Sequence, residues 1–400
     1  MQPPRPKVSR SPDVLTRKKG GSSRGGSERL PDRTGSGSEG LPDRVALPSR
    51  PGRPPTHAER LVQARVAVVH PTQASAPVEL DDSDLSPKTW NHCFDQKEDL
   101  RLPSRNATFR IYAAGLTQET SLAMVFLHGG GHCALSWAMV AERLKAYCAV
   151  LAFDARAHGN SFSEDENDLS AQTQVYDAAA LIKAFFEERS MPVPKLVVCG
   201  HSMGGAIAVR LAASNLLDNV IGLVVIDVVE GTAMSALPYM SSWLQGRPKS
   251  FSSVSKAVKY VTRAGHVRNP DSARISVPPQ MKYDDRIKRW VWRTRLEESE
   301  TYWKGWFQGL SSSFLSVKAA KMLVLANVDR LDKDLMIAQM QGKFQNILIP
   351  AAGHTVHEDQ PDETARVLLE YLQRNLFIER LDDSAETSVF QQRRPIPPCC

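Results

Sequence analysis

A serine set between two glycines is the clearest candidate for chemistry in this sequence. Gly200, Ser202 and Gly204 follow an apolar run over residues 195–199 and precede a helix-like run over residues 206–213. A tight turn between a strand and a helix exposes the serine hydroxyl, and glycine avoids a Cβ clash where neighbouring backbone crowds the turn. The first N–H groups of such a helix face any negative charge that develops there. The spacing therefore predicts a nucleophilic serine at Ser202.

A serine hydroxyl needs a base that removes its proton at neutral pH, and two histidines near the end of the chain are candidates. His354 directly follows Gly353 after the strand-like run 347–349, and His357 lies further along the same loop. We predict His354 as the base because it sits where the strand ends. The His-x-x-His spacing is also typical of metal sites, but no third ligand cluster of matching kind occurs. We therefore predict neither a metal ion nor a cofactor.

An imidazole base needs a carboxylate that fixes its tautomer and stabilises its protonated form. Asp227 follows the apolar run 223–226, and Asp329 follows the apolar run 322–326. Both runs can end at the same crevice of a sheet. Spacing alone therefore leaves both aspartates open as the acid.

Ester chemistry at a serine also needs N–H donors for the oxyanion. The backbone N–H of Met203, directly after the nucleophile, predicts one donor. The glycines after the run 122–127 let backbone approach a substrate closely, and we assign further donors to Gly130 and Gly131. Loss of one such donor typically costs about 3–4 kcal/mol of transition-state stabilisation.

Two polar features beside these residues are interpreted as structural. His201 precedes the nucleophile, and a histidine there is more often a packing residue than a catalytic one. The loop over residues 154–159 follows another apolar run and is predicted to shape the edge of the site.

The elements that position these residues follow a simple rhythm, in which continuous apolar runs alternate with helical segments. The continuous runs cover residues 122–127, 149–153, 195–199, 223–226, 322–326 and 347–349, and residues 108–112 alternate with the period of 2 that is typical of an early strand. Apolar strands that alternate with helices indicate a mostly parallel sheet covered by helices on both faces. Polar or glycine residues follow several runs, at the edge where open α/β sheets bind ligands. With its histidine last in the chain, the pattern predicts an α/β-hydrolase fold.

The composition divides the chain further. We predict a disordered basic arm rich in Pro, Gly and Ser over residues 1–85, a hydrolase domain over residues 86–380 and a flexible tail over residues 381–400. The alternation of apolar runs and helical segments is interrupted at about residues 231–316, which hold five of the seven tryptophans. We interpret this stretch as a mostly helical cap inserted over the sheet.

The net charge of +6 comes from the arm, since residues 1–60 hold 13 Lys and Arg against 6 Asp and Glu. A basic arm is not a basic folded face, so we predict no nucleic-acid function. No apolar run approaches the roughly 18 residues of a membrane helix, and no signal-peptide core is present. Cys148 and Cys199 lie in apolar runs, where reduced thiols are normal. We therefore predict no membrane association and a cytoplasmic or nuclear location.

Several longer segments resemble the protein phosphatase methylesterase family, and the resemblance spans about residues 90–376. The matching segments are His128–Trp137, Gly200–Val209, Ile226–Met234, Tyr302–Leu310, Val328–Asp334 and Gly353–Asp359. The sequence Val-Val-Glu-Gly-Thr-Ala-Met over residues 228–234 is the most distinctive of them.

The resemblance implies an activity and a partner. This family removes the methyl ester from the C-terminal leucine carboxylate of the type 2A protein phosphatase catalytic subunit. Carried over by motif, its nucleophile falls on Ser202, its base on His354 and its acid on Asp227, in place of Asp329. The family's long acidic insertion in the cap is absent, and residues 279–292 are short and basic. Contacts that depend on that insertion are not expected here.

Two other functions fit the same residues. One is a small-molecule α/β-hydrolase esterase with the same Ser-His-Asp triad. The other is a non-catalytic protein that sequesters the phosphatase. Methanol release from a methylated phosphatase, and labelling of Ser202 by a fluorophosphonate, distinguish these alternatives.

Overall fold

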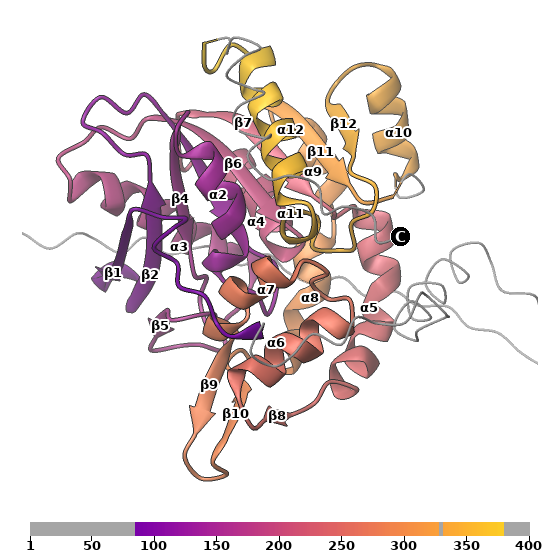
Figure 1. The fold of residues 1–400 in the computed structure, drawn as a ribbon. Coiled ribbons are helices and arrows are strands. Elements are labelled where there is room, and N and C mark those ends of the chain that lie inside the picture. The colour runs from indigo at the N-terminus through magenta and orange to yellow at the C-terminus, as the bar shows by residue number, and fades with distance from the viewer. Residues whose placement is uncertain (1–84, 328–330, 380–400) are drawn as a thin grey trace, which may run out of the picture. The chain divides into compact units, whose positions relative to one another are not determined.

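A twisted sheet of mostly parallel strands organises the computed structural model, which describes residues 85–327 and 331–379 (Figure 1). The strand order is β1-β2-β4-β3-β6-β7-β11-β12, and β5 pairs with β2. All neighbours from β4 to β12 run parallel, whereas β2 is antiparallel to both β1 and β4. The strands are β1 (Gln96–Leu102), β2 (Ala107–Ala114), β3 (Leu122–Leu127), β4 (Ala149–Phe153), β5 (Phe162–Ser163), β6 (Lys195–His201), β7 (Val220–Ile226), β11 (Ala320–Leu325) and β12 (Gln345–Leu348).

Helices cover both faces of this sheet. The helices are α2 (Ala138–Leu144), α3 (Ala171–Glu187), α4 (Met203–Ala213), α5 (Glu230–Gln245), α6 (Val254–Arg263), α7 (Pro270–Ser276), α8 (Glu300–Phe307), α9 (Leu310–Ser316), α10 (Lys333–Met340), α11 (Val356–Asp359) and α12 (Pro361–Arg374). Side chains of α3 and α4 pack on one face, and side chains of α2 and α12 pack on the other. In Figure 1, α2 and α12 lie in front of the sheet. The predicted α/β-hydrolase fold class is confirmed.

The two faces are built by the alternation of side chains along each strand. In β3, Val125 and Leu127 join the cluster beneath α3 and α4, while Met124 and Phe126 join the cluster beneath α2 and α12. All four side chains are buried. A strand covered on both sides must be apolar at every position, which explains the unbroken apolar runs in the sequence.

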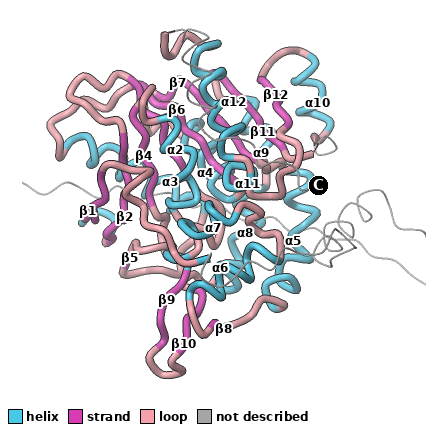
Figure 2. The backbone as a smooth tube through the Cα atoms, in the orientation of Figure 1, coloured by secondary structure: helices cyan, strands magenta, loops and turns pink. Residues whose placement is uncertain are grey.

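The segment between β7 and β11 contains helices and a second, three-stranded antiparallel sheet. Its strands are β8 (Ser250–Phe251), β9 (Met281–Asp284) and β10 (Arg289–Trp292), in the order β8-β10-β9. Figure 2 shows this sheet at the bottom of the view, apart from the main sheet. The predicted cap over residues 231–316 was expected to be mostly helical, and this small sheet was not foreseen.

Parts of the predicted domain organisation cannot be compared with the structure. The basic arm, except for Leu85, and the tail over residues 381–400 lie outside the described residues. Asp329, one of the two candidate acids, also lies outside them. The domain boundaries therefore stay predictions.

Candidate active site

Ser202 occupies the turn between β6, which ends at His201, and α4, which begins at Met203. Its backbone has φ of 53° and ψ of −119°, a conformation that a residue with a Cβ adopts only under strain. Such strain at a strand–helix turn is the geometry that lifts a nucleophile out of the sheet.

The two flanking glycines are required by the close approach of backbone. A Cβ at Gly200 would lie 2.1 Å from the carbonyl oxygen of Gly204, and a Cβ at Gly204 would lie 2.3 Å from the carbonyl oxygen of Leu127. No side chain fits at either position without moving the chain. The Gly-x-Ser-x-Gly spacing thus reflects packing inside the turn.

Asp227 and His354 come together across 127 residues of chain. The Nδ1 atom of His354 lies 2.7 Å from Oδ2 of Asp227. The other carboxylate oxygen of Asp227 accepts the N–H of Ala326 at 3.1 Å. The Asp227 side chain is fully buried, and that of His354 is 50% exposed. Because a carboxylate only accepts, Nδ1–H of His354 is the donor in this hydrogen bond.

His357, the alternative base in the same loop, lies in a different environment. Its ring is fully buried and stacks on Trp137 with the ring centroids 4.0 Å apart. Neither of its ring nitrogens has a hydrogen-bond partner among the described residues. Burial holds the pKa of His357 well below its usual value, so the ring is neutral. Of the two histidines, His354 is therefore the one that the structure pairs with an aspartate.

The structure brings His354 close to the nucleophile turn through His201. The rings of His201 and His354 lie 4.7 Å apart between centroids, and His201 directly precedes Ser202. Within residues 85–327 and 331–379, no hydrogen bond forms from the Ser202 hydroxyl to His354. In the absence of substrate, catalytic hydrogen bonds are often long and tighten only when substrate binds.

Two of the predicted oxyanion donors are the backbone N–H groups of Met203 and Gly130. Met203 is the first residue of α4, where the backbone N–H groups have no acceptor within the helix. Gly130 approaches the side chains of Met203 and Leu296, since a Cβ on Gly130 would lie 3.8 Å from Sδ of Met203 and 3.3 Å from Leu296. These two amides remain our predicted oxyanion donors.

The third predicted donor, Gly131, has another partner. Its N–H donates to Nε2 of His158 at 2.9 Å, while Nδ1 of His158 donates to the carbonyl oxygen of Arg156. Burial lowers the pKa of His158 to about 4, which keeps Nε2 available as an acceptor at neutral pH. The Gly131 N–H is thus already satisfied, and we no longer propose it as an oxyanion donor.

A second buried histidine fixes the other end of the same loop. His128 accepts the N–H of Ala155 at Nε2, at 2.9 Å, and its Nδ1 donates to the carbonyl oxygen of Gly129 at 2.8 Å. Burial and the neighbouring His158 hold the pKa of His128 well below its usual value. We name residues 128–131 the oxyanion loop. Two neutral histidines tie it to the segment after β4.

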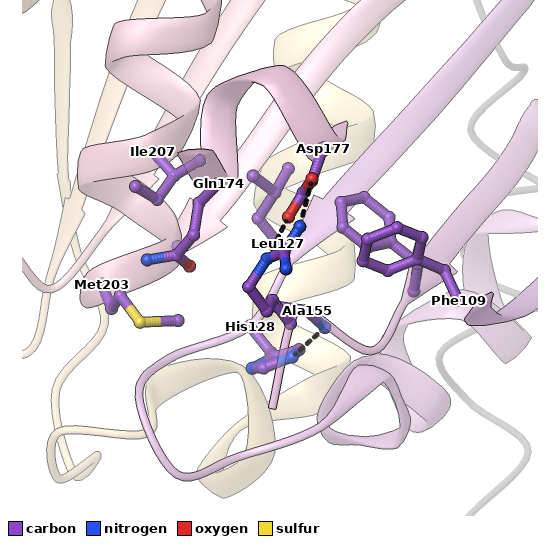
Figure 3. A pocket seen from close by; sticks show the side chains of 11 residues that line it. Phe109, Leu127, His128, Ala155, Gln174, Asp177, Met203 and Ile207 are labelled. Carbon is purple, nitrogen blue, oxygen red and sulfur yellow. Dashed lines mark hydrogen bonds and ion pairs between the residues drawn. The ribbon is translucent and has the colours of Figure 1, made fainter. Parts of the chain in front are cut away.

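A small cavity lies behind the turn, on the side of β4 (Figure 3). Its volume is about 20 Å³, enough for roughly one water molecule. It is lined by Phe109, Leu127, His128, Phe153, Ala155, Arg156, Gln174, Asp177, Met203, Gly204 and Ile207. Figure 3 shows Met203 and His128 on one side and Asp177, paired with a buried arginine, on another. The cavity is too small for a substrate side chain.

We found no metal site in the part of the chain that the structure describes, where no three His, Cys, Asp or Glu side chains are placed to hold an ion. Within the same residues, none of the helices combines the length and the apolar character needed to cross a membrane.

Comparison with known proteins identifies the family. The model of the alpha/beta hydrolase family matches residues 124–367. Protein phosphatase methylesterase 1 of Homo sapiens is 40% identical over 341 residues, which cover 74% of this chain and 87% of that protein. The chain belongs to the protein phosphatase methylesterase family. The probable protein phosphatase methylesterase 1 of Caenorhabditis elegans is 43% identical over 307 residues, 75% of this chain and 82% of that protein. The predicted family and enzyme class, a carboxylic ester hydrolase of the serine hydrolase type, are confirmed.

Solved structures support the fold. E-2-(acetamidomethylene)succinate hydrolase superposes with a TM-score of 0.58 at 20% identity, over 69% of this methylesterase-family chain and 99% of that structure. An esterase of Mycobacterium tuberculosis superposes with a TM-score of 0.54 at 21% identity, over 74% and 99% of the two chains. At these identities the likeness concerns the fold alone.

Sequence reasoning missed the role of Glu230, in the most distinctive family motif. Its two carboxylate oxygens accept the N–H of Gly309 at 2.8 Å and the N–H of Ser311 at 3.0 Å. Gly309 has φ of 75° and precedes α9, whereas Glu230 begins α5. The carboxylate thus fastens the last helix of the segment between β7 and β11 to the first. The distinctive motif over residues 228–234 marked Glu230 in the sequence, but only the structure reveals which N–H groups its two carboxylate oxygens bind.

Proposed function

We propose that this chain hydrolyses the methyl ester on the C-terminal leucine of the type 2A protein phosphatase catalytic subunit, with Ser202, His354 and Asp227 as its triad. The observation that carries the proposal is the 2.7 Å contact between His354 and Asp227 beside the strained turn of Ser202. The names of the relatives support the choice of a phosphatase as substrate.

The reaction begins with proton transfer. Nδ1–H of His354 donates a hydrogen bond to Asp227, which leaves Nε2 of His354 as the base that takes the proton of the Ser202 hydroxyl. Ser202 Oγ then attacks the ester carbonyl, and the carbonyl oxygen takes the negative charge. The N–H groups of Met203 and Gly130 stabilise this oxyanion. Asp227 stays ionised and stabilises the imidazolium.

The tetrahedral intermediate collapses in the second step. The bond from carbon to the methoxy oxygen breaks, and Nε2 of His354 gives its proton to that oxygen, so methanol leaves. The leucine carbonyl remains as an ester of Ser202. A water molecule, deprotonated by His354, then attacks this acyl-enzyme and releases the free carboxylate and the serine hydroxyl.

Specificity must come from outside the reacting bond. A methyl group offers little surface for recognition, and the cavity behind the turn holds roughly one water molecule. Contacts with remote parts of a substrate lower the activation barrier of the reaction when they are stronger in the transition state than in the bound ground state. We therefore expect the body of the phosphatase, and not the ester alone, to determine the rate.

Methanol release tests the proposal. The substrates are the methylated phosphatase catalytic subunit, a methylated peptide of its C-terminus, and a simple aryl ester, each with wild type and with Ser202→Ala. We expect kcat/KM to be highest for the intact phosphatase and activity to vanish in Ser202→Ala. Turnover of the aryl ester without methanol release from the phosphatase would instead identify a small-molecule esterase.

A further inference from the structure

His201 contacts the backbone of the proposed base. Its Nε2 lies 2.8 Å from the carbonyl oxygen of His354, and its ring is 1% exposed. A carbonyl oxygen can only accept a hydrogen bond, so Nε2 of His201 carries the proton and donates. The residue before the nucleophile thus holds the main chain of the base, 153 residues further along.

The His201 ring fills the space between the oxyanion loop and the loop of His354. A Cβ on Gly129 would lie 2.7 Å from its Nδ1 atom, and the ring of His357 lies 4.7 Å away between centroids. The His132 ring meets it edge-on at 5.7 Å. Close packing on these sides holds the imidazole in one position. Position 129 must be glycine for the ring to lie there, because any Cβ would clash with Nδ1 of His201.

Nδ1 of His201 is buried and has no hydrogen-bond partner among the residues described. Burial, followed by the nearby His357, His354 and His132, holds the pKa of His201 well below its usual value. A proton on Nδ1 would be a buried donor without an acceptor, which is costly. The ring therefore stays neutral with its proton on Nε2, pointed at the His354 carbonyl.

His354 has few other side-chain restraints. Its ring is half exposed and is bound at Nδ1 by Asp227. The adjacent residues anchor the loop, since Gly353 donates to Asp359 at 2.6 Å and Thr355 donates to the carbonyl of His266 at 2.8 Å. Among the described residues, the hydrogen bond from His201 is the contact that holds the backbone of His354 itself to the nucleophile turn.

We propose that His201 is a positioning residue, which sets the distance from His354 to Ser202 by its hydrogen bond to the His354 carbonyl. This inference rests on the proposed triad. Since His201 and Ser202 are consecutive, any shift of the turn moves the support of the base with it. A misplacement of a reacting group by 1 Å can lower a rate by about 100-fold.

Three variants test this role. His201→Phe keeps an aromatic ring but removes the donor, and His201→Gln keeps an N–H donor of similar reach. His357→Phe is the matched control, because its ring lies in the same buried layer and makes no hydrogen bond to the described residues. The readouts are kcat and KM for methanol release, the rate of Ser202 labelling by a fluorophosphonate, and the melting temperature.

We expect His201→Phe to lower kcat and the labelling rate by about 100-fold while KM changes by less than about 2-fold. His201→Gln should recover most of the lost rate, and His357→Phe should stay within about 3-fold of wild type. Equal losses in His201→Phe and His357→Phe, or no recovery in His201→Gln, would overturn the inference. A wild type that releases no methanol from the phosphatase contradicts the proposed function instead, so the two failures are distinct.

Discussion

At the scale of single residues, the activity depends on the identity of one carboxylate. Asp227 is buried, bonded to His354 and held by the N–H of Ala326, so Asp227→Asn changes the charge and little of the shape. An asparagine that donates to His354 fixes the wrong tautomer, and we expect methanol release to fall by about 10⁴-fold with the fold intact. Circular dichroism and kcat measured on the same sample check both parts.

Asp329→Asn is the control for this prediction. It changes the other aspartate that the sequence left open, and we expect it to retain activity close to wild type. If Asp329→Asn is the inactive variant, the assignment by motif was wrong. Spacing along the chain could not choose between the two, because the choice depends on which strand end faces His354, and only the family motif favoured Asp227.

The strain at Ser202 leads to a second prediction at this scale. Its φ of 53° is unfavourable with a Cβ and free for glycine. Ser202→Gly should therefore have a free energy of unfolding about 1 kcal/mol higher than that of Ser202→Ala, although both variants are inactive. Urea unfolding of the two proteins measures the difference. Equal stability would mean that the turn relaxes around any residue.

At the scale of elements, Glu230 links the first helix of the segment between β7 and β11 to the last. Its carboxylate accepts the N–H of Gly309 and of Ser311, so Glu230→Ala leaves two partly buried donors unpaired. We expect a loss of about 1–3 kcal/mol in stability, and faster proteolysis within residues 231–316. Glu300→Ala, at an exposed position in the first turn of α8, should change neither. Unchanged proteolysis in Glu230→Ala would show that packing alone holds α9 against α5.

The elements also show where sequence reasoning succeeded and failed. β3 and β4 were predicted to the residue, because strands buried on both faces are continuous apolar runs between turns. β1 was missed, since its residues Gln96–Leu102 are mostly charged or exposed at the edge of the sheet. β8, β9 and β10 were missed because each is very short and exists only through pairing with the others. Such pairing is a tertiary effect that no local pattern carries.

The candidate site divides in the same way. Ser202 and His354 follow from motifs and from their position after strands, both of which are local signals. The hydrogen bonds that position the site are not local in sequence. His158 accepts a hydrogen bond from the N–H of Gly131, and His201 donates to the carbonyl of a residue 153 positions further along the chain. A histidine that accepts from a backbone amide looks, in sequence, like any other buried histidine.

At the scale of the whole molecule, buried neutral histidines make stability depend on pH. In the part of the chain that the structure describes, burial lowers the pKa of His128, His158, His201, His266 and His357. The unfolded chain binds protons on these groups below about pH 6.5, whereas the folded chain does not until about pH 4 for His158 and His266. Stability is therefore present above about pH 6.5 and is lost as the pH falls toward 4.

The buried carboxyl groups of Asp154 and Asp359 act in the opposite direction, because burial raises the pKa of both. The pKa of Asp154 rises to about 6, so as the pH falls the folded chain binds this proton before the unfolded chain does, and part of the loss of stability is offset.

A comparison with His158→Gln isolates the contribution of one histidine, since glutamine can accept a hydrogen bond from the Gly131 N–H but does not titrate. Between pH 6 and pH 5, its free energy of unfolding should fall less than that of wild type, by about 1 kcal/mol. Identical pH profiles would show that His158 is not neutral in the folded chain.

The most direct test of the account is to identify the residue that a fluorophosphonate labels. Mass spectrometry of the labelled wild-type chain should place the adduct on Ser202, and labelling should disappear in Ser202→Ala and slow by orders of magnitude in His354→Ala. An adduct on another residue, or a well-folded wild type that does not label, would contradict the claim that Ser202 is the activated nucleophile.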